Sequence, residues 1–341
     1  LSMIHELKEI INQAATNQQK GLKNVLATVV FLEGSSYRKP GVRMLISEDL
    51  SSVGAVSGGC VEKEIIQRAS TVFANNKPKV ITYDGRYKLG CEGILYVLIE
   101  PFFISDKLIT ALSNCSSKRN SLKIESRFKK ENEAFGNFGS IIIFENKEQF
   151  QFSETFNPQS KEETAIFSQI IQPAFKLIII GGEHDAVKLC KIASQLGWEI
   201  TVITSVKDSK QIIDFPGASS VIGHSPETIE FVDICTNTAI VIMNHSYVQD
   251  LKYLIQLSKH QPKYIGILGA PNRREKLFNE LFEYAPETTE VFLDSIYTPA
   301  GLHIGAKTPE EIGLSIVAEI LSVIREKEPF SLRKLQGKIH I

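Results

Sequence analysis

The stretch KLIIIGGEHDAVKLCKIASQLGWEITVIT, residues 176–204, decides the fold of the second half of the chain. It contains a short apolar run, a glycine pair, a segment of helical character and a second short apolar run. Such runs are typical of strands buried on both faces of a parallel sheet, and helices connect these strands. The alternation continues, with strands expected at 219–223, 239–243 and 264–270 and helices at 245–260 and 272–284. The pattern predicts an α/β domain over residues 173–341, with a Rossmann-like doubly wound parallel sheet.

The first half of the chain also has mixed α/β character. Residues 1–105 predict one α/β domain, with helices at 4–20 and 61–75 and strands at 24–33, 42–49, 79–84 and 93–101. Residues 106–172 are less regular and include the polar stretch NPQSKEET. We expect a helix at 106–114 and strands at 121–128 and 139–145 there, and interpret the segment as a connector that ends at Pro173.

The last helix of the chain has a well-marked start. Thr308 is expected to be its N-cap, and Pro309 takes the first helical position, where a missing backbone N–H costs nothing. Glu311 stands three residues after Thr308, as in a capping box.

Composition restricts the classes of function. The 341 residues exceed the usual size of a single core, and Lys+Arg 38 nearly balance Asp+Glu 39, so we expect no nucleic-acid partner. The apolar runs are much shorter than the roughly 20 residues that span a bilayer, and the acidic, amphipathic start is unlike a secretory signal. Five cysteines without a Cys-x-x-Cys pair argue against a disulfide framework and for a reducing compartment. We therefore expect a cytoplasmic protein with no membrane partner.

The turn in EGSSYRKPGVRML, residues 33–45, has the composition of an anion site. Ser36 supplies a hydroxyl and a backbone amide, and Arg38 and Arg43 supply fixed positive charge. Arginine forks match phosphate oxygens at two points. The alternative is a surface hairpin with solvated arginines, and the residues alone leave both interpretations open.

The stretch GAVSGGCVEKEI, residues 54–65, places a cysteine where a helix is expected to begin. The unpaired amides and dipole of a helix start lower the pKa of a cysteine and attract anions. Gly58 and Gly59 permit close approach to the backbone, and Glu62 adds a carboxylate beside Cys60. A small residue packed at a tight turn is the structural alternative.

A second cysteine, Cys91, is flanked by glycines in the stretch LGCEGILYVLIEP. Two such cysteines in one domain are able to line one cleft. Their separation along the chain does not define a distance, so Cys60 and Cys91 also fit a chance pair, or a cysteine-based redox or metal-binding site.

Gly181 and Gly182 lie between a strand and a helix, where a Rossmann fold binds a pyrophosphate. The dinucleotide fingerprint is incomplete, because Glu183 stands where a further glycine is expected and would repel phosphate. Thr204 replaces the acid expected after the second strand. These differences argue against tight NAD(P) binding. His245 follows another strand end, where α/β folds place ligands, although a structural histidine fits the same position.

Taken together, these stretches resemble the XdhC/CoxI family. The first domain does so through GSSYRKPGVRMLIS, GAVSGGCVEKEI and YKLGCEGILYVLIEP, in the order of the family's N-terminal domain. The second domain resembles the family's Rossmann-like domain through GGEHDAVKLCKIASQLGWEITVI, AIVIMNHSYVQDL, YIGILGAPNRREKL and GLHIGAKTPEEIGLSIVAEIL. The resemblance covers nearly the whole chain except residues 106–172.

The resemblance implies an accessory factor for a xanthine dehydrogenase-type molybdenum hydroxylase. Such a factor binds the molybdenum cofactor (molybdopterin) transiently, holds it while a cysteine desulfurase supplies its sulfido ligand, and delivers it to the client enzyme. It is a cofactor-binding chaperone more than a catalyst, and we expect a homodimer. An NAD(P)-dependent oxidoreductase and a cysteine-based redox or metal-binding protein are the alternatives.

The resemblance also assigns candidate contacts. Cys60 matches the family's Gly-Gly-Cys position and is the candidate molybdenum contact, and Cys91 matches a second cysteine motif. Arg38 and Arg43 match basic positions suited to the cofactor phosphate. The remaining candidates for cofactor binding are Ser36, Gly58, Gly59, Glu62, Gly181, Gly182 and His245.

Overall fold

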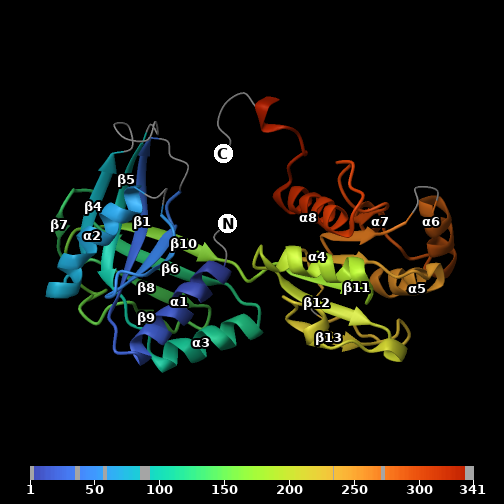
Figure 1. The fold of residues 1–341 in the computed structure, drawn as a ribbon, viewed down its shortest axis with the longest axis horizontal. Helices are drawn as coiled ribbons and strands as arrows, with labels where there is room; N and C mark the ends of the chain where they lie inside the picture. The colour runs from blue at the N-terminus through green and yellow to red at the C-terminus, as the bar shows by residue number, and fades with distance from the viewer. Residues whose placement is uncertain are drawn as a thin grey trace. The chain divides into compact units, whose positions relative to one another are not determined.

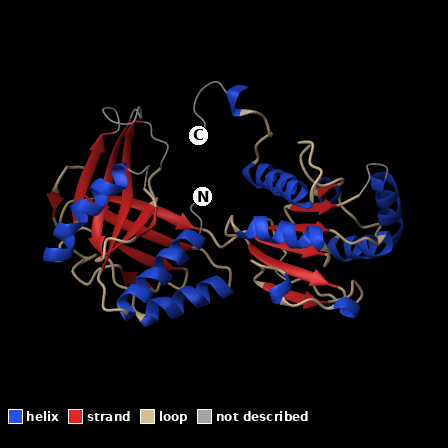
Figure 2. Ribbon diagram, in the orientation of Figure 1, coloured by secondary structure: helices blue, strands red, loops and turns tan. Residues whose placement is uncertain are grey.

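The chain forms two compact units in a computed structural model, Leu1–Ala174 and Phe175–Ile341 (Figure 1). The structure describes residues 4–34, 39–56, 60–84, 93–232, 234–269 and 273–334. None of the helices in this described part combines the length and the apolar character needed to cross a membrane. Each unit has its own sheets and helices, and the two units are considered separately (Figure 2).

An antiparallel sheet of order β3-β2-β1-β5-β4-β7 forms the first layer of unit 1. One face packs on helix α2 through a core that includes Val61, Ile65 and Ala69. The elements of this layer are α1 Ile4–Gln19, β1 Asn24–Gly34, β2 Arg43–Ser47, β3 Ser52–Gly54, α2 Cys60–Asn75, β4 Lys79–Asp84, β5 Gly93–Pro101 and β7 Ala134–Phe135.

The other face of this layer meets a second antiparallel sheet, of order β10-β6-β8-β9. Leu26 and Leu45 of the first sheet share one core with Ile124 and Ile142 of the second. The second layer consists of α3 Asp106–Ser117, β6 Leu122–Phe128, β8 Gly139–Phe144, β9 Gln149–Gln151 and β10 Ala165–Ile171.

The segment 106–172 is therefore more than a connector. It lies inside unit 1 and supplies half of the sheet sandwich. The expected strands at 121–128 and 139–145 are present as β6 and β8. Strand β10 was not expected, because its apolar residues follow a long polar stretch and its pairing partner lies far back in the chain.

Unit 2 confirms the predicted Rossmann-like fold. Its sheet has the order β13-β12-β11-β14-β15-β16 with every strand pair parallel, which is the order of Rossmann domains. Helices α4 and α8 pack on one face, and α5 and α6 on the other. The elements are β11 Lys176–Ile180, α4 His184–Ser194, β12 Glu199–Thr204, β13 Ser220–Gly223, β14 Thr238–Ile242, α5 Tyr247–Leu257, β15 Tyr264–Ile267, α6 Arg273–Tyr284, α7 Glu290–Asp294, β16 Ile296–Tyr297 and α8 Pro309–Arg325, with short 3-10 helices at Val206–Asp208, Ile212–Asp214 and Leu332–Lys334.

The predicted start of the last helix is confirmed in detail. The Thr308 hydroxyl accepts a hydrogen bond from the backbone N–H of Glu311, and the Glu311 carboxylate accepts one from the backbone N–H of Thr308. Pro309 occupies the first position of α8. The cap fixes where α8 begins, and α8 then covers the same face of the sheet as α4.

Candidate functional site

Three strands of the first sheet in unit 1 begin or end at the same end of the sheet, where the connecting loops join them. Gly34 at the end of β1 pairs with Gly93 at the start of β5, and Asp84 at the end of β4 pairs with Ile94. We call the edge formed by Gly34, Asp84 and Gly93 the loop edge. The segments 35–38 and 85–92, with the candidate residues Ser36, Arg38 and Cys91, join the sheet here and lie outside the described residues.

Helix α2 points its first turn toward the loop edge. Its last turn, with Val72 and Phe73, lines a cavity together with Asn24 and Pro101, which mark the far end of β1 and β5. A 16-residue helix is about 24 Å long, so its first residue, Cys60, lies toward the opposite end of the strands. The chain thus brings three predicted motifs to one end of the sheet.

The first turn of α2 carries one described candidate side chain. Glu62 is partly buried, and its Oε1 atom is shielded from solvent without a hydrogen-bond partner among the described residues. The adjacent candidates Gly58 and Gly59, and the side chain of Cys60, lie outside the described residues. A shielded carboxylate at this place gives the helix start an acidic as well as a thiol group.

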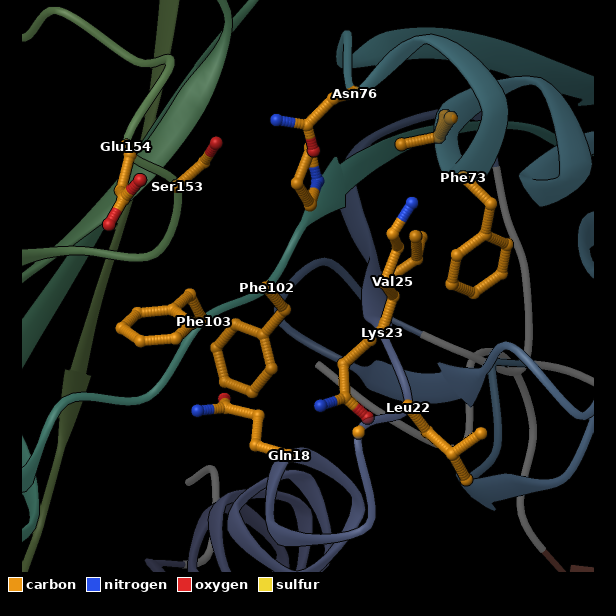
Figure 3. Close-up of a pocket in the computed structure, with 14 residues that line it drawn as sticks. Gln18, Leu22, Lys23, Val25, Phe73, Asn76, Phe102, Phe103, Ser153 and Glu154 are labelled. Atoms are coloured by element: carbon orange, nitrogen blue, oxygen red, sulfur yellow. The ribbon is translucent and has the colours of Figure 1, made fainter.

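The cavity at the far end of the sheet is a separate feature. It has a volume of about 610 Å³, and its walls include Lys23, Phe73, Phe102, Phe103 and Glu154 (Figure 3). Its lining includes none of the described residues that were predicted to contact a ligand. The predicted motifs and this cavity therefore lie at opposite ends of one sheet.

The prediction that Arg43 contacts a bound phosphate is revised by its position. Arg43 lies on β2 and is 7% exposed, between the two sheets of unit 1. Its Nη1 donates to the carbonyl of Gly41 at 2.9 Å and to Oε1 of Gln169 on β10 at 2.7 Å. Burial lowers the pKa of Arg43 to about 10, while Glu100 acts in the opposite direction. Arg43 thus joins the two sheets through Gln169, while its Nε and Nη2 atoms are buried without a hydrogen-bond partner among the described residues. We therefore propose a structural role for Arg43 and leave it out of the proposed ligand contacts.

A buried acid, Glu100 on β5, is the counterpart of Arg43 and was missed in the sequence. It is fully buried, and its carboxylate accepts hydrogen bonds from the backbone N–H and the hydroxyl of Ser140 on β8, at 2.8 and 2.5 Å. Burial raises the pKa of Glu100 to about 7, against the hydrogen bonds from Ser140 and the charge of Arg43. The one sequence signal is an acid at the end of the apolar run GILYVLIEP.

Glu100 predicts a pH dependence for the stability of unit 1. The pKa of Glu100 is higher in the folded chain, about 7, than the ordinary value of 4.5. The folded state therefore binds more protons between these values, and the free energy of unfolding falls as pH rises from 4.5 to 7. The loss is at most about 3 kcal/mol. Urea unfolding of Glu100→Gln from pH 4.5 to 8 is expected to lack this slope.

The exposed acid Glu131 offers a matched control for that measurement. Glu131→Gln removes one carboxylate from the same unit without removing a buried one, so its stability should follow the unaltered chain at every pH. Equal slopes for Glu100→Gln and Glu131→Gln would rule out Glu100 as the source of the pH dependence.

The candidates of unit 2 gather at the carboxyl ends of β11 and β14. These strands are neighbours at the centre of the sheet, where the strand order reverses and Rossmann folds bind ligands. Gly181 follows β11, and a Cβ atom there would lie 2.9 Å from the carbonyl oxygen of Met243, which follows β14. Gly182 comes next, and His245 is exposed just beyond Met243. The sequence candidates of this unit therefore lie together at the carboxyl ends of two neighbouring strands.

The charged groups nearest to this edge are Glu183 and an ion-paired lysine. Glu183 is the N-cap residue of α4, and its side chain makes no capping hydrogen bond. Thr204 is buried at the end of β12, and its Cγ2 would lie 3.4 Å from a Cβ atom on Gly182. The nearby Lys210 is paired with Asp208 at 2.9 Å. Thr204 stands where the acid expected for a ribose would be, and Lys210 pairs with the exposed Asp208. Within the described ranges of both units, no group of three or more His, Cys, Asp or Glu side chains is arranged to hold a metal ion.

Comparison with known proteins assigns the family. The model of the XdhC and CoxI family matches residues 18–84, and the model of the XdhC Rossmann domain matches residues 177–320. A Bacillus subtilis (strain 168) protein, named as a probable subunit of xanthine dehydrogenase, is 32% identical over 87% of this chain and 92% of its own length. The chain belongs to the XdhC/CoxI family.

Two further proteins are similar over nearly the whole chain. The molybdenum cofactor insertion chaperone PaoD of Escherichia coli (strain K12) is 23% identical over 94% of this chain and 90% of its own length. A crystal structure of a Bacillus halodurans protein named as a xanthine dehydrogenase has a TM-score of 0.74 and 28% identity, covering 94% of this chain and 96% of that one. The similarity spans both units, including the segment 106–172.

Proposed function

We propose that this XdhC/CoxI protein is an accessory factor that binds the molybdenum cofactor as cargo and delivers it to a xanthine dehydrogenase-type molybdenum hydroxylase. One observation carries the proposal: the described strand ends and α2 direct three cysteine- or arginine-bearing motifs to one loop edge. The relative named a cofactor insertion chaperone and the relative named for xanthine dehydrogenase support the same role.

The chemistry of the cargo matches the residues at this edge. The cofactor has an anionic phosphate at one end and a soft metal–sulfur centre at the other. Arg38 and Ser36 are suited to the phosphate, and Cys60 at the start of a helix is suited to the molybdenum end, with Cys91 on the neighbouring segment. Glu62 adds a carboxylate to the first turn of the same helix.

The role implies two protein partners and a defined order of events. A cysteine desulfurase supplies the sulfido ligand while the cofactor is held, and the molybdenum hydroxylase then receives it. Binding must be transient, so the contacts have to exchange with those of the client. We propose no dinucleotide for unit 2, in line with Glu183 at the start of α4 and the uncharged Thr204.

Cofactor retention tests the proposal directly. The protein is mixed with released molybdenum cofactor and separated by gel filtration, and molybdenum and pterin are measured in the protein fraction. We expect both to elute with the unaltered chain and most of the retained cofactor to be lost in Cys60→Ala. Cys235→Ala, which alters an exposed cysteine of unit 2, is the matched control and should retain the cofactor.

Two outcomes would count against the proposal at different levels. Absence of both molybdenum and pterin from the unaltered protein would contradict cargo binding itself. Equal retention by Cys60→Ala and Cys235→Ala would leave cargo binding intact and remove Cys60 from the contact. In the same assay Arg38→Ala is expected to weaken retention, and an unchanged value would place the phosphate elsewhere.

A further inference from the structure

The cavity at the far end of the first sheet in unit 1 has the size of a ligand site and fixed polar walls. Its volume of about 610 Å³ falls within the range of small-molecule sites, roughly 300–1,000 Å³. The Gln18 side chain accepts from the backbone N–H of Ile104 at 2.7 Å and donates to the carbonyl of the same residue at 3.0 Å. The Asn24 side chain is held by Asn17 and by the carbonyl of Ala14. These two amides are already paired, so other groups are left to contact a ligand.

The floor of the cavity is apolar and aromatic. Val25 and Val72 reach it from the core under α2, and Phe102 reaches it from the core between the two sheets. Phe102 packs edge-to-face on Phe152 with ring centroids 5.0 Å apart, which fixes its position. Phe103 is 50% exposed, although its backbone N–H donates to the carbonyl of Phe152 at 2.8 Å. A half-exposed aromatic ring on a fixed backbone favours contact with the apolar body of a ligand.

Three polar side chains of the lining are available to a ligand. Lys23, Asn76 and Glu154 are exposed, and their side chains make no hydrogen bond or ion pair with another described residue. Figure 3 shows Lys23 and Phe73 on one side of the cavity and Glu154 and Phe103 on the other. Two opposite charges thus line one cavity without forming an ion pair with each other.

Asn76 is brought to the cavity by the residues that end α2. It follows the last residue of the helix, has a φ of +56°, and its backbone N–H donates to the carbonyl of Val72 at 2.9 Å. Asparagine is one of the few residues that commonly adopt this left-handed conformation after a helix. The turn that ends α2 therefore also supplies an amide to the cavity.

All the named walls of the cavity belong to unit 1. The segments 35–38 and 85–92 join the first sheet at the loop edge, which is the opposite end of the sheet. The segment 57–59 precedes α2, and the cavity is lined by the last turn of that helix. The described residues of unit 1 thus define the cavity at the end of the sheet that is far from these segments.

We propose that this cavity binds a small zwitterionic molecule with an apolar middle. Its anionic group is held by Lys23 and Asn76, and its ammonium group by Glu154, while Phe102 and Phe103 contact the middle. An ammonium and an amide N–H donate to a carboxylate, and the Glu154 carboxylate accepts from an ammonium. A second anionic group on the ligand is disfavoured, because it would face Glu154. The site is distinct from the loop edge and does not depend on the proposed function.

Three matched probes test the class of ligand. The compounds para-(aminomethyl)benzoate, para-methylbenzoate and terephthalate share a benzoate ring and differ in the opposite group, which is an ammonium, a methyl or a second carboxylate at neutral pH. Isothermal titration calorimetry of the full chain is expected to give a dissociation constant of about 1 mM or lower for the aminomethyl compound. The methyl compound should bind about fivefold more weakly, and terephthalate more weakly again.

Three variants test the residues. Lys23→Gln and Asn76→Gly are each expected to raise the dissociation constant of the aminomethyl compound about fivefold or more. Glycine accepts the left-handed backbone at position 76, so the end of α2 is retained. Glu154→Gln is expected to remove the preference for the aminomethyl over the methyl compound and to leave binding of the methyl compound unchanged.

Two charge-matched variants serve as controls. Lys20→Gln and Glu131→Gln each remove an exposed charge of unit 1 that is not part of the described lining. Both should bind the three probes as the unaltered chain does. Circular dichroism confirms that all variants remain folded.

Any of three results would overturn the proposal. The first is no binding of the aminomethyl compound to the unaltered chain, and the second is an equal dissociation constant for all three probes. The third is binding that Lys23→Gln and Glu154→Gln leave unchanged, because the probe would then lie elsewhere. Cofactor retention is measured separately, so none of these results bears on the proposed function.

Discussion

Replacing Arg43 by methionine is expected to lower the free energy of unfolding of unit 1 by about 2–3 kcal/mol, because the Gly41 carbonyl and the Gln169 side chain lose their buried donor. Methionine retains much of the side-chain volume but removes the charge opposite Glu100 and the hydrogen bonds to Gly41 and Gln169. The longer-range attraction between Arg43 and the buried Glu100 is lost as well. Far-UV circular dichroism during urea unfolding reports this loss.

The single tryptophan separates the two units in that experiment. Trp198 is buried in unit 2, so its fluorescence should follow the unfolding of unit 2 and change little in Arg43→Met. Arg127→Met is the matched control, because Arg127 is only partly buried and makes one long contact, 3.4 Å to the carbonyl of Ser160. We expect it to cost less than about 1 kcal/mol.

A double variant distinguishes the charge pair from general packing. Arg43→Met combined with Glu100→Gln removes both buried charges, so part of the lost stability should return. A double variant that is less stable than Arg43→Met alone would contradict the charge account. Folded Arg43→Met should also retain the molybdenum cofactor, since Arg43 lies between the sheets and not among the proposed contacts.

Replacing Gly181 by alanine is expected to destabilise unit 2 by about 2–3 kcal/mol. Gly181 has a φ of +143°, which disfavours any side chain, and its Cβ atom would lie 2.9 Å from the carbonyl oxygen of Met243. Both atoms in this contact belong to strand ends at the centre of the sheet, so neither can move freely. Unfolding followed by Trp198 fluorescence measures the effect.

Two other glycines separate the causes of that loss. Gly305→Ala has φ strain at +78° but no atom within 4 Å of the new Cβ, so it should cost about 1 kcal/mol. Gly182→Ala has an ordinary contact of 3.4 Å to Thr204 Cγ2 and should cost less still. A loss for Gly181→Ala no larger than that for Gly305→Ala would show that the approach to Met243 is unimportant.

The Rossmann-like half could be predicted because its signals are local. Strands β11, β14 and β15 are short, largely apolar runs that are each followed by a helix, and the α8 start is marked by three residues within one turn. The loop edge was predictable only as separate motifs. The sequence contains Cys60 and Cys91, but the pairing of Gly34 with Gly93 that directs the segments to one edge is a property of the folded sheet.

The sandwich of unit 1 could not be predicted, because its contacts join distant parts of the chain. Arg43 meets Gln169, 126 positions away, and Glu100 meets Ser140, 40 positions away. No local pattern distinguishes an arginine between two sheets from one that faces a phosphate. Strand β10 was missed for the same reason, because its pairing partner β6 lies far back in the chain. Its seven residues of mixed character do not by themselves indicate a strand.

The place of β10 at the end of unit 1 has a consequence for synthesis on the ribosome. Helix α1, made first, shares its core with Ile171, made last, so that core stays incomplete until residue 171 has emerged. At a synthesis rate of about 5–20 residues per second, the apolar face of α1 lacks its contact with Ile171 for roughly 10–30 seconds. The strand–helix–strand unit of residues 176–204 can form its contacts as soon as its own residues have been synthesised. Nascent unit 1 is therefore the part of this chain that most needs shelter from aggregation while it is being made.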